Sequence, residues 1–192
     1  MEGNITVKIL DNTVISASLK EIKTINLIER CLKRYKLVTS EYVFVETLKG
    51  FSNPTIENCY SDIEVHEINE EMFNFLLDYL ERRFPYLHRG ELSSFLVALL
   101  KYAENGKSYY YVTDDRRMRD TISKILNDPI VKSKLKNPIT PENFNLTGTI
   151  GLLLRLKYRG LISKEEAKKI ADDLENSSFR VTPELLKKLR ED

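Results

Sequence analysis

A chain of 192 residues can form one domain with a sizeable core but is too short for two ordinary domains. Apolar residues make up 42% of it and charged residues 31%, as in soluble globular proteins. Because the net charge is only +1, the molecule as a whole does not attract nucleic acid, and any phosphate binding must come from local basic patches.

The composition also argues against several classes of protein. The longest apolar runs, such as residues 95–100, are far shorter than a membrane span, and the N-terminus lacks the pattern of a signal peptide. We therefore expect a cytoplasmic protein with no membrane partner. The two cysteines, Cys31 and Cys59, form no CxxC pair, and with only two histidines a structural zinc site has no plausible set of ligands.

Strands and helices alternate along the first half of the chain. Residues 5–10 alternate apolar and polar side chains and stop at Asp11-Asn12, which indicates a strand running into a turn. Apolar residues recur at helical spacing over residues 18–35. The predicted elements, in order, are a strand at 5–10, a helix at 18–35, a strand at 37–38, a helix capped at 39–41 that runs to about 48, a strand at 63–68, and a helix that Asn69 caps and that ends near Arg83.

The second half continues the alternation but contains one irregular stretch. Residues 127–145 include three prolines and read as an insertion with one short helix. The predicted elements are a helix at about 89–104 ended by Asn105-Gly106, a strand at 108–113, a basic helix from about 116, an apolar helix opening at 147–154, and helices at 163–176 and 182–189 on either side of a short strand at 179–181.

Strands that alternate with helices favour a mainly parallel sheet with helices on both faces. We therefore predict a single α/β domain over residues 1–192, a three-layer α/β/α sandwich around a central, mainly parallel sheet. The insertion at about 127–145 and the C-terminal helices at about 163–189 belong to the same domain.

Acidic residues occur where ligands bind in such a sheet, at the carboxyl ends of its strands. Two carboxylates about 5 Å apart repel by roughly 3 kcal/mol. A divalent Mg²⁺ or Mn²⁺ ion would reverse that repulsion, because such ions prefer oxygen ligands. The candidates are Asp11 after the first strand, Glu46 in the helix after the second strand, Glu91 in the helix before the aromatic strand, and Asp114 with Asp115 at the end of that strand.

Basic residues lie close to these acids in the sequence, and they could hold the oxygens of a phosphodiester. Simpler explanations stay open for every group. Acidic residues suit helix N-termini, and Asp114-Asp115 could be an N-cap with a neighbour. The tyrosines at 109–111 could stack on bases, although packing in the core explains them better. The basic candidates are Arg89, Arg116, Arg117 and Arg119.

Three motifs in chain order resemble those of the PIN-domain family, the metal-dependent ribonucleases that include VapC-type toxins. They are LHRGE at residues 87–91, VTDDRR at 112–117 and GTIGLLLRLKYRGLIS at 148–163. The similarity extends from Ile5 to about Leu189. It implies a PIN-like fold and the Mg²⁺- or Mn²⁺-dependent endonucleolytic cleavage of single-stranded RNA.

The resemblance also implies roles for individual residues. The carboxylates with a catalytic role would be Asp11, Glu46, Glu91 and Asp114. The metal would be held by Asp11, Glu91 and Asp114, with Asp115 as a further ligand or a neighbour of the ligands. Small polar positions that orient a carboxylate or a water molecule would be Thr13 and Thr113. Contacts to the substrate would come from Arg89, Arg116 and Thr13.

The same resemblance implies an RNA substrate, an antitoxin protein with a segment that covers the acidic cleft, and homodimerisation. Residues 127–145 depart from the family pattern, because they intervene between the DDRR helix and the GT segment and leave access of the substrate open. The main alternative is a catalytically inactive PIN-like module that binds nucleic acid or protein. A nucleotide-binding sheet protein is disfavoured, because the sequence has neither GxGxxG nor GxxxxGK followed by Ser or Thr.

Overall fold

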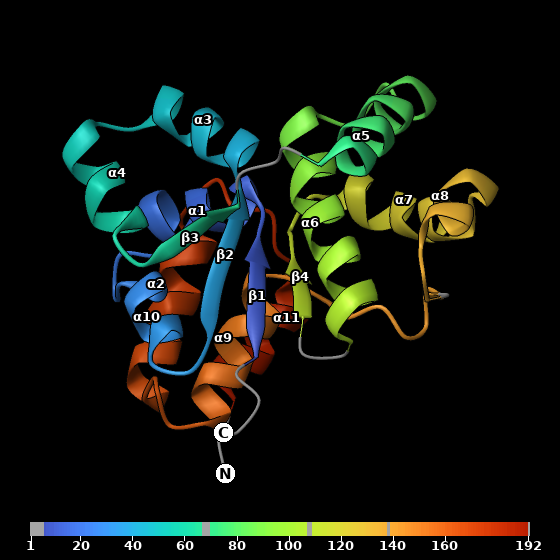
Figure 1. The fold of residues 1–192 in the computed structure, drawn as a ribbon. Coiled ribbons are helices and arrows are strands. Elements are labelled where there is room, and N and C mark those ends of the chain that lie inside the picture. The colour runs from blue at the N-terminus through green and yellow to red at the C-terminus, as the bar shows by residue number, and fades with distance from the viewer. Residues whose placement is uncertain (1–5, 67–69, 107–108, 138, 192) are drawn as a thin grey trace, which may run out of the picture.

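The structure of the chain, a computed structural model, describes residues 6–66, 70–106, 109–137 and 139–191. Five strands form the central sheet in the order β3-β2-β1-β4-β5, and all four pairings between neighbours are parallel (Figure 1). The predicted α/β fold with a mainly parallel sheet is confirmed. The strands are β1 (Val7–Leu10), β2 (Lys36–Ser40), β3 (Ile63–His66), β4 (Tyr109–Val112) and β5 (Leu146–Thr147).

Helices fill the connections between the strands. In the described ranges, none of them combines the length and the apolar character that crossing a bilayer requires. They are α1 (Asn12–Ser16), the π-helical turn η1 (Ala17–Glu21), α2 (Leu27–Leu32), α3 (Glu41–Gly50), α4 (Asn53–Tyr60), α5 (Glu71–Arg83), α6 (Arg89–Asn105), α7 (Arg116–Asn127), α8 (Pro129–Lys134), α9 (Thr149–Tyr158), α10 (Lys164–Glu175) and α11 (Pro183–Arg190).

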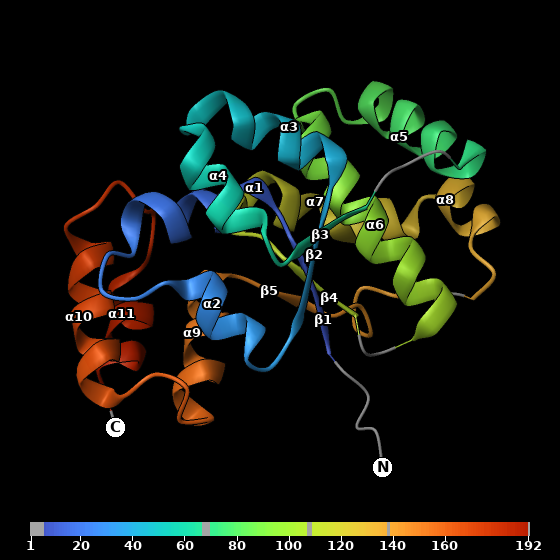
Figure 2. The same cartoon turned by 60° about the vertical axis from the view of Figure 1, so that its left-hand side comes forward.

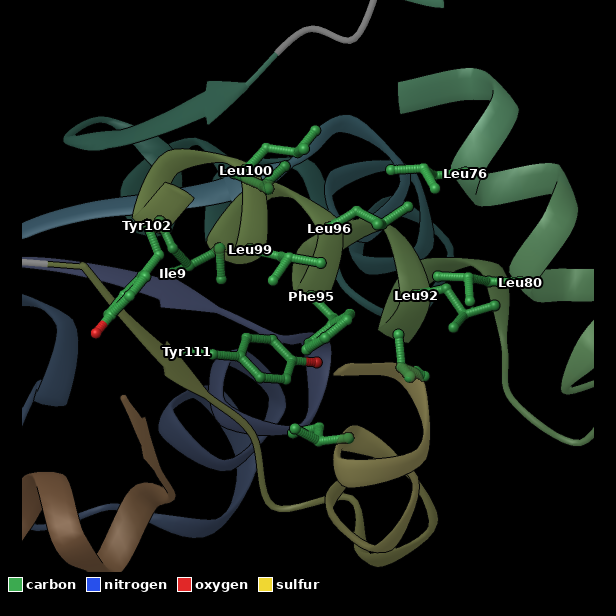
Figure 3. Packing of buried hydrophobic residues seen from close by; sticks show 14 of the residues in the cluster. Ile9, Leu76, Leu80, Leu92, Phe95, Leu96, Leu99, Leu100, Tyr102 and Tyr111 are labelled. Carbon is green, nitrogen blue, oxygen red and sulfur yellow. The ribbon is translucent and has the colours of Figure 1, made fainter. Parts of the chain in front are cut away.

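Two hydrophobic cores, one on each face of the sheet, give the molecule its three layers (Figures 1 and 2). Successive side chains of a strand point to opposite faces. Ile9 therefore packs into the core under α5 to α8, and Leu10 packs into the core under α1, α2 and α9 to α11. In the first core the rings of Phe95 and Tyr111 meet edge-on, with centroids 5.7 Å apart (Figure 3). Tyr111 is fully buried, so this tyrosine of the aromatic run serves the core.

The central helix of the first core is α6, which packs between the sheet and α5. Because it is covered on both sides, most of its length is buried. It ends at Gly106, whose φ of 77° is a left-handed conformation that glycine adopts without strain. The predicted helix end at Asn105-Gly106 is confirmed.

The single helix predicted over residues 18–35 is wrong in extent, because helical structure breaks between Glu21 and Leu27. The backbone N–H groups of Lys23 and Thr24 donate to a carboxylate oxygen of Asp173 in α10, at 2.8 and 2.7 Å. A distant side chain thus satisfies donors that a continuous helix would have bonded internally. No local pattern of apolar residues can reveal such a partner.

Other differences concern short elements. The sequence did not predict α4 or the two-residue strand β5. Residues 179–181, predicted as a strand, are irregular and join no strand of the sheet in the described part of the chain. Ile5, Ile68, Asn69 and Ser108, which the predictions include, lie outside the described residues.

Within residues 128–137 and 139–145, which the structure describes, the short predicted helix is α8, and the rest is irregular as predicted. Val131, Ile139 and Phe144 are buried in the core on the α6 face. The ring of Phe144 lies 5.5 Å from that of Phe95 between centroids. The insertion therefore extends the hydrophobic core.

Candidate active site

The sheet places the carboxyl ends of β1 and β4 side by side. From β1 the chain moves to β2 and β3 on one side, and it then returns through β4 and β5 on the other side. The strand order therefore reverses between β1 and β4, and such a reversal opens a crevice where α/β proteins bind ligands. Asp11 directly follows β1, and residues 113–115 directly follow β4.

Asp11 is a fully buried carboxylate held by hydroxyl groups. One of its oxygens accepts hydrogen bonds from Thr13 Oγ1 at 3.0 Å and Thr113 Oγ1 at 2.8 Å, and the other accepts from Ser94 Oγ at 3.5 Å. Within the described ranges, no lysine or arginine forms an ion pair with it. Burial raises the pKa of Asp11 to about 6, although the threonine hydroxyls act in the opposite direction.

Glu91 lies in the first turn of α6, and its side chain is buried. Its Oε2 accepts a hydrogen bond from the backbone N–H of His88 at 3.1 Å, which caps the helix. Burial, together with the charges of Asp115 and Asp11, raises the pKa of Glu91 to about 7. Glu91 therefore shares its surroundings with these two carboxylates.

Asp115 is the N-cap of α7, because its Oδ1 accepts from the N–H of Met118 at 2.7 Å. Its Oδ2 lies 3.9 Å from Nη2 of Arg117, and the same Nη2 lies 3.9 Å from Oε1 of Glu91. Arg117 thus bridges two carboxylates at the surface. We call the group formed by Asp11, Glu91 and Asp115 the acidic edge.

Asp114 points away from this group, toward the start of α9. One of its oxygens accepts from the N–H of Thr149 at 2.9 Å, and the other accepts from Thr149 Oγ1. Gly148 permits this approach, because a Cβ there would lie 2.5 Å from Asp114 Oδ1. Burial raises the pKa of Asp114, and the charge of Arg119 opposes that rise. Asp115 therefore lies beside Asp11 and Glu91, whereas the resemblance implied Asp114 as the ligand there.

Thr13 and Thr113 tie the ends of β1 and β4 together. Besides donating to Asp11, Thr13 Oγ1 accepts from the N–H of Asp114 at 3.1 Å, and Thr113 Oγ1 accepts from the N–H of Asp115 at 3.1 Å. Both hydroxyls therefore orient the Asp11 carboxylate, which is the kind of role that the resemblance implied.

Glu46 reaches the same end of the sheet from α3. Its carboxylate lies against Gly90 in the first turn of α6, where a Cβ would meet Oε2 at 2.4 Å. A helix N-terminus favours a negative charge beside its first turn. Glu46 therefore lies beside the acidic edge, against Gly90, which precedes Glu91 in the chain.

The arginines expected to hold phosphate differ in availability. Arg89 is paired with Glu81 and with Asp78, 3.3 Å away, so α5 holds its guanidinium. Its predicted contact to substrate is therefore not supported by its position. The Arg116 side chain is 93% exposed, and its ion pair with Asp120, at 3.5 Å, is of the weak surface kind.

A cleft of about 1070 Å³ opens beside the acidic edge. The loop between α10 and α11 contributes Phe179 and Arg180 to it, two residues that the sequence did not single out because they read as a strand. Among the described residues that line the cleft, none comes from the insertion at 127–145. The sequence did not decide whether the insertion restricts access of the substrate. The described residues of the insertion do not line this cleft and therefore do not restrict access to it. The other contributors include Thr13, Asp114, Asp115, Arg116, Arg117 and Leu185.

The donor set of the acidic edge suits a hard divalent cation. Carboxylate oxygens are the ligands that Mg²⁺ and Mn²⁺ take, and Asp11 is a buried charge for which the described chain supplies hydroxyl donors. Across the same residues, no three His, Cys, Asp or Glu side chains are arranged as a ready-made ion site. The residues fit such an ion by their chemistry.

Comparison with known protein families gives a match to part of the chain. A family model described as "PIN domain" matches residues 138–192, a segment that includes the GTIGLLL motif and lies outside the acidic edge. No curated protein and no solved structure matches the chain. PIN domains are generally nucleases, and PIN nucleases typically use divalent metals. The family match over residues 138–192 supports the predicted resemblance to PIN domains, and the five-stranded parallel sheet has the α/β fold that this resemblance implies.

Proposed function

We propose that the chain is a divalent-metal-dependent endoribonuclease that cleaves single-stranded RNA at the acidic edge. The observation that carries this proposal is the position of Asp11. It is a fully buried carboxylate, and Glu91 and Asp115 are close enough for charge interactions. A buried charge is costly unless it is paired or binds a metal. A divalent cation would supply the missing positive charge.

Each part of the edge has a function in this proposal. When bound, the cation would lower the pKa of a water molecule and polarise the phosphodiester. Asp11, Glu91 and Asp115 would hold the cation, and Thr13 and Thr113 would keep Asp11 in its orientation. No covalent intermediate with the protein is needed.

The cleft offers groups that suit a single strand of RNA. Arg116, Arg117 and Arg180 line it and can donate to phosphate oxygens, while Phe179 offers an aromatic ring on which a base can stack. In this proposal Arg117 exchanges its two carboxylate partners for the phosphate when the cation binds.

Cleavage assays on matched variants test the proposal. Labelled single-stranded RNA is incubated with Mn²⁺ and with wild type, Asp11→Asn or Asp115→Asn, and we expect both variants to lose at least roughly 100-fold in rate. Asparagine at 115 can still cap α7, so the loss would not come from an unfolded helix. Asp114→Asn is the matched neighbour, and its loss should be smaller because Asp114 is bonded to Thr149.

Equal cleavage by the wild type and both edge variants would mean that the activity belongs to a contaminant or to another site. If Asp114→Asn alone abolished cleavage, the assignment of Asp115 to the edge would be wrong.

Thermal melting tests the edge without any substrate. In EDTA, Asp11→Asn should melt above the wild type, because the change removes a buried charge and its repulsion by Glu91 and Asp115. A gain of about 1 kcal/mol would raise the midpoint by roughly 2–4 °C in a chain of this size. Mn²⁺ should raise the midpoint of the wild type and leave that of the variant unchanged. Asp62→Asn, at an exposed position, serves as the control.

A catalytically inactive PIN-like module that binds nucleic acid or protein is the second candidate. The bridge that Arg117 makes between Glu91 and Asp115 favours it, because a guanidinium there satisfies both carboxylates without a metal. RNA that is retained but never cut, together with a midpoint indifferent to Mn²⁺, would identify this module.

We further propose, from the family resemblance, that the chain acts as a toxin with a protein antitoxin and forms a homodimer. A segment of the antitoxin would cover the cleft, where Phe179, Val181 and Leu185 offer apolar surface. Expression of the wild type should slow growth of a bacterial host, and Asp11→Asn should relieve that effect. Light scattering of the purified protein measures the oligomeric state.

A further inference from the structure

A second pocket, of about 450 Å³, lies at the opposite ends of the same strands. It is formed where β1, β2 and β4 begin, by Lys8, Tyr110 and the residues just before β2, and α9 covers it. It shares no lining residue with the cleft. Lys8 and Asp11 belong to the same stretch of chain but lie on the order of 10 Å apart along it. The two sites are therefore separate. We call this one the basic pocket, after its residues Lys8, Arg34, Arg155 and Arg159.

Lys8 is the innermost residue of the basic pocket, with 1% of its surface exposed. Its Nζ lies 3.5 Å from the ring centroid of Tyr110 and 4.8 Å from that of Tyr35. Within the described part of the chain it has no carboxylate partner. Burial and, to a smaller extent, the charge of Arg155 lower the pKa of Lys8 to about 7. Lys8 is thus a buried amine whose charged form is stabilised by aromatic rings but by no carboxylate of the described residues.

The three arginines of the basic pocket also lack a carboxylate partner among the described residues, and two of them lie near aromatic rings. Arg155 lies over the Tyr110 ring at 4.9 Å, and Arg159 lies near the Tyr158 ring at 6.0 Å. For Arg34, Arg155 and Arg159, the described residues provide no ion pair with an acid, whereas Arg30 of α2 is paired with Glu166. Like charges gathered in this way repel each other, and an anionic ligand would reverse the sign of the interaction.

Aromatic rings give the basic pocket a second kind of chemistry. Tyr35 and Tyr110 are half-buried, and Tyr158 is 87% exposed at the end of α9. A large exposed ring beside guanidinium groups can stack on a nucleobase while the arginines bind its phosphate. The volume lies within the range of small-molecule pockets, roughly 300–1000 Å³.

We propose that the basic pocket binds a nucleoside monophosphate group. Arg155, Arg159 and Lys8 would contact the phosphate, and Tyr158 would stack against the base. Arginine presents a planar fork of donors that matches phosphate oxygens in pairs, and Lys8 adds a charge from below. The same chemistry occurs in a free nucleotide and at the 5′-phosphorylated end of an RNA strand. The proposal does not depend on cleavage at the acidic edge.

Calorimetric titration of the full chain in EDTA, in a phosphate-free buffer, tests this inference. The probes are AMP, adenosine and inorganic phosphate. AMP should bind at least roughly 10-fold more tightly than either fragment, because it alone engages both the arginines and the ring. Two RNA trinucleotides, one with a 5′-phosphate and one with a 5′-hydroxyl, separate the two sources of the ligand. Tight binding of the phosphorylated trinucleotide would identify an RNA end, and its failure beside tight binding of AMP would identify a free nucleotide.

Variants place the binding in the basic pocket. Arg155→Gln and Arg159→Gln should each weaken AMP binding at least roughly 10-fold, and Tyr158→Ala should weaken AMP binding but not phosphate binding. These three side chains are exposed, so the thermal midpoints should stay close to that of the wild type. Arg82→Gln, an exposed arginine of α5, is the matched control and should bind AMP as the wild type does.

Three results would overturn the inference. The first is AMP binding no tighter than adenosine binding. The second is wild-type affinity in both arginine variants. The third is the absence of measurable binding for every phosphate-bearing probe at millimolar concentration.

Discussion

Asp114 and Asp115 are neighbours in the chain, yet their side chains serve different elements. Asp115 caps α7 and faces Glu91 across Arg117, whereas Asp114 is bonded to Thr149 at the start of α9. In both cases a backbone N–H at a helix start selects the carboxylate. The direction of each side chain therefore depends on the helix it caps, and not on its distance in sequence from Asp11.

Lys8 gives a prediction at the same scale. Its pKa is lowered from 10.5 to about 7 in the folded protein, so between these values the unfolded chain binds more protons and stability should rise with pH. Lys8→Met removes this dependence. Between pH 7 and 9 the free energy of unfolding of the wild type should rise, relative to that of the variant, by up to about 1.4 kcal/mol per pH unit. Urea unfolding of both proteins at pH 7, 8 and 9 measures the difference.

The comparison isolates Lys8 from its neighbours. Burial raises the pKa of Cys31 to about 12, so that thiol stays neutral over the range and is present in both proteins. Curves of stability against pH that run parallel for wild type and variant would show that Lys8 titrates normally in the folded state.

At the scale of elements, a glycine at the start of each of two helices lies in close contact with a carboxylate from another element. Gly90 at the start of α6 lies against Glu46, and Gly148 before α9 lies against Asp114. In both places the missing side chain makes room for a carboxylate from another element. These glycines therefore position acids as well as helices.

Gly148→Ala tests this at the start of α9. The new Cβ would lie 2.5 Å from Asp114 Oδ1, so we expect a loss of about 1–3 kcal/mol in the free energy of unfolding. Gly50→Ala, at the end of α3, is the control. No atom lies within 4 Å of its added Cβ, and we expect no loss, or a gain of up to about 1 kcal/mol. Denaturant titration measures both, and equal stability of the two variants would contradict the tight fit at Gly148.

At the scale of the whole molecule, basic groups occur in two separate places while the net charge stays at +1. The cleft contains three arginines, Arg116, Arg117 and Arg180. If RNA lies in the cleft, it releases about one counterion for each phosphate that these residues neutralise. The logarithm of the binding constant should then fall with the logarithm of salt concentration with a slope of roughly −2.

Binding of single-stranded RNA in EDTA at several salt concentrations measures this slope. A value steeper than about −4 would show that RNA also contacts basic residues beyond the cleft. Repeating the titration with Arg155→Gln would then ask whether the basic pocket is one of those contacts. An unchanged steep slope in that variant would place the additional contacts elsewhere.

Much of the fold was predictable because each core-facing pattern is local. The alternation in β1, the apolar run within α6 and the Asn105-Gly106 stop are properties of neighbouring residues. The break between η1 and α2 was not predictable, because Asp173 of α10 supplies the bonds that replace helical ones. Residues 179–181 were wrongly predicted as a strand for a similar reason. Their apolar side chains cover the second core without a neighbouring strand.

By itself, the sequence determined that strands alternate with helices, that the sheet is parallel, and that acidic residues follow β1 and β4. These features depend on periodicity and on residue types at element ends. The tertiary structure decided which acids meet: it joined Asp115 to Asp11 and Glu91, gave Asp114 to α9, and held Arg89 against α5. It also brought Lys8 and Arg155 into one pocket. The physical reason is that a side chain turns toward its strongest available partner, and that partner comes from a distant part of the chain.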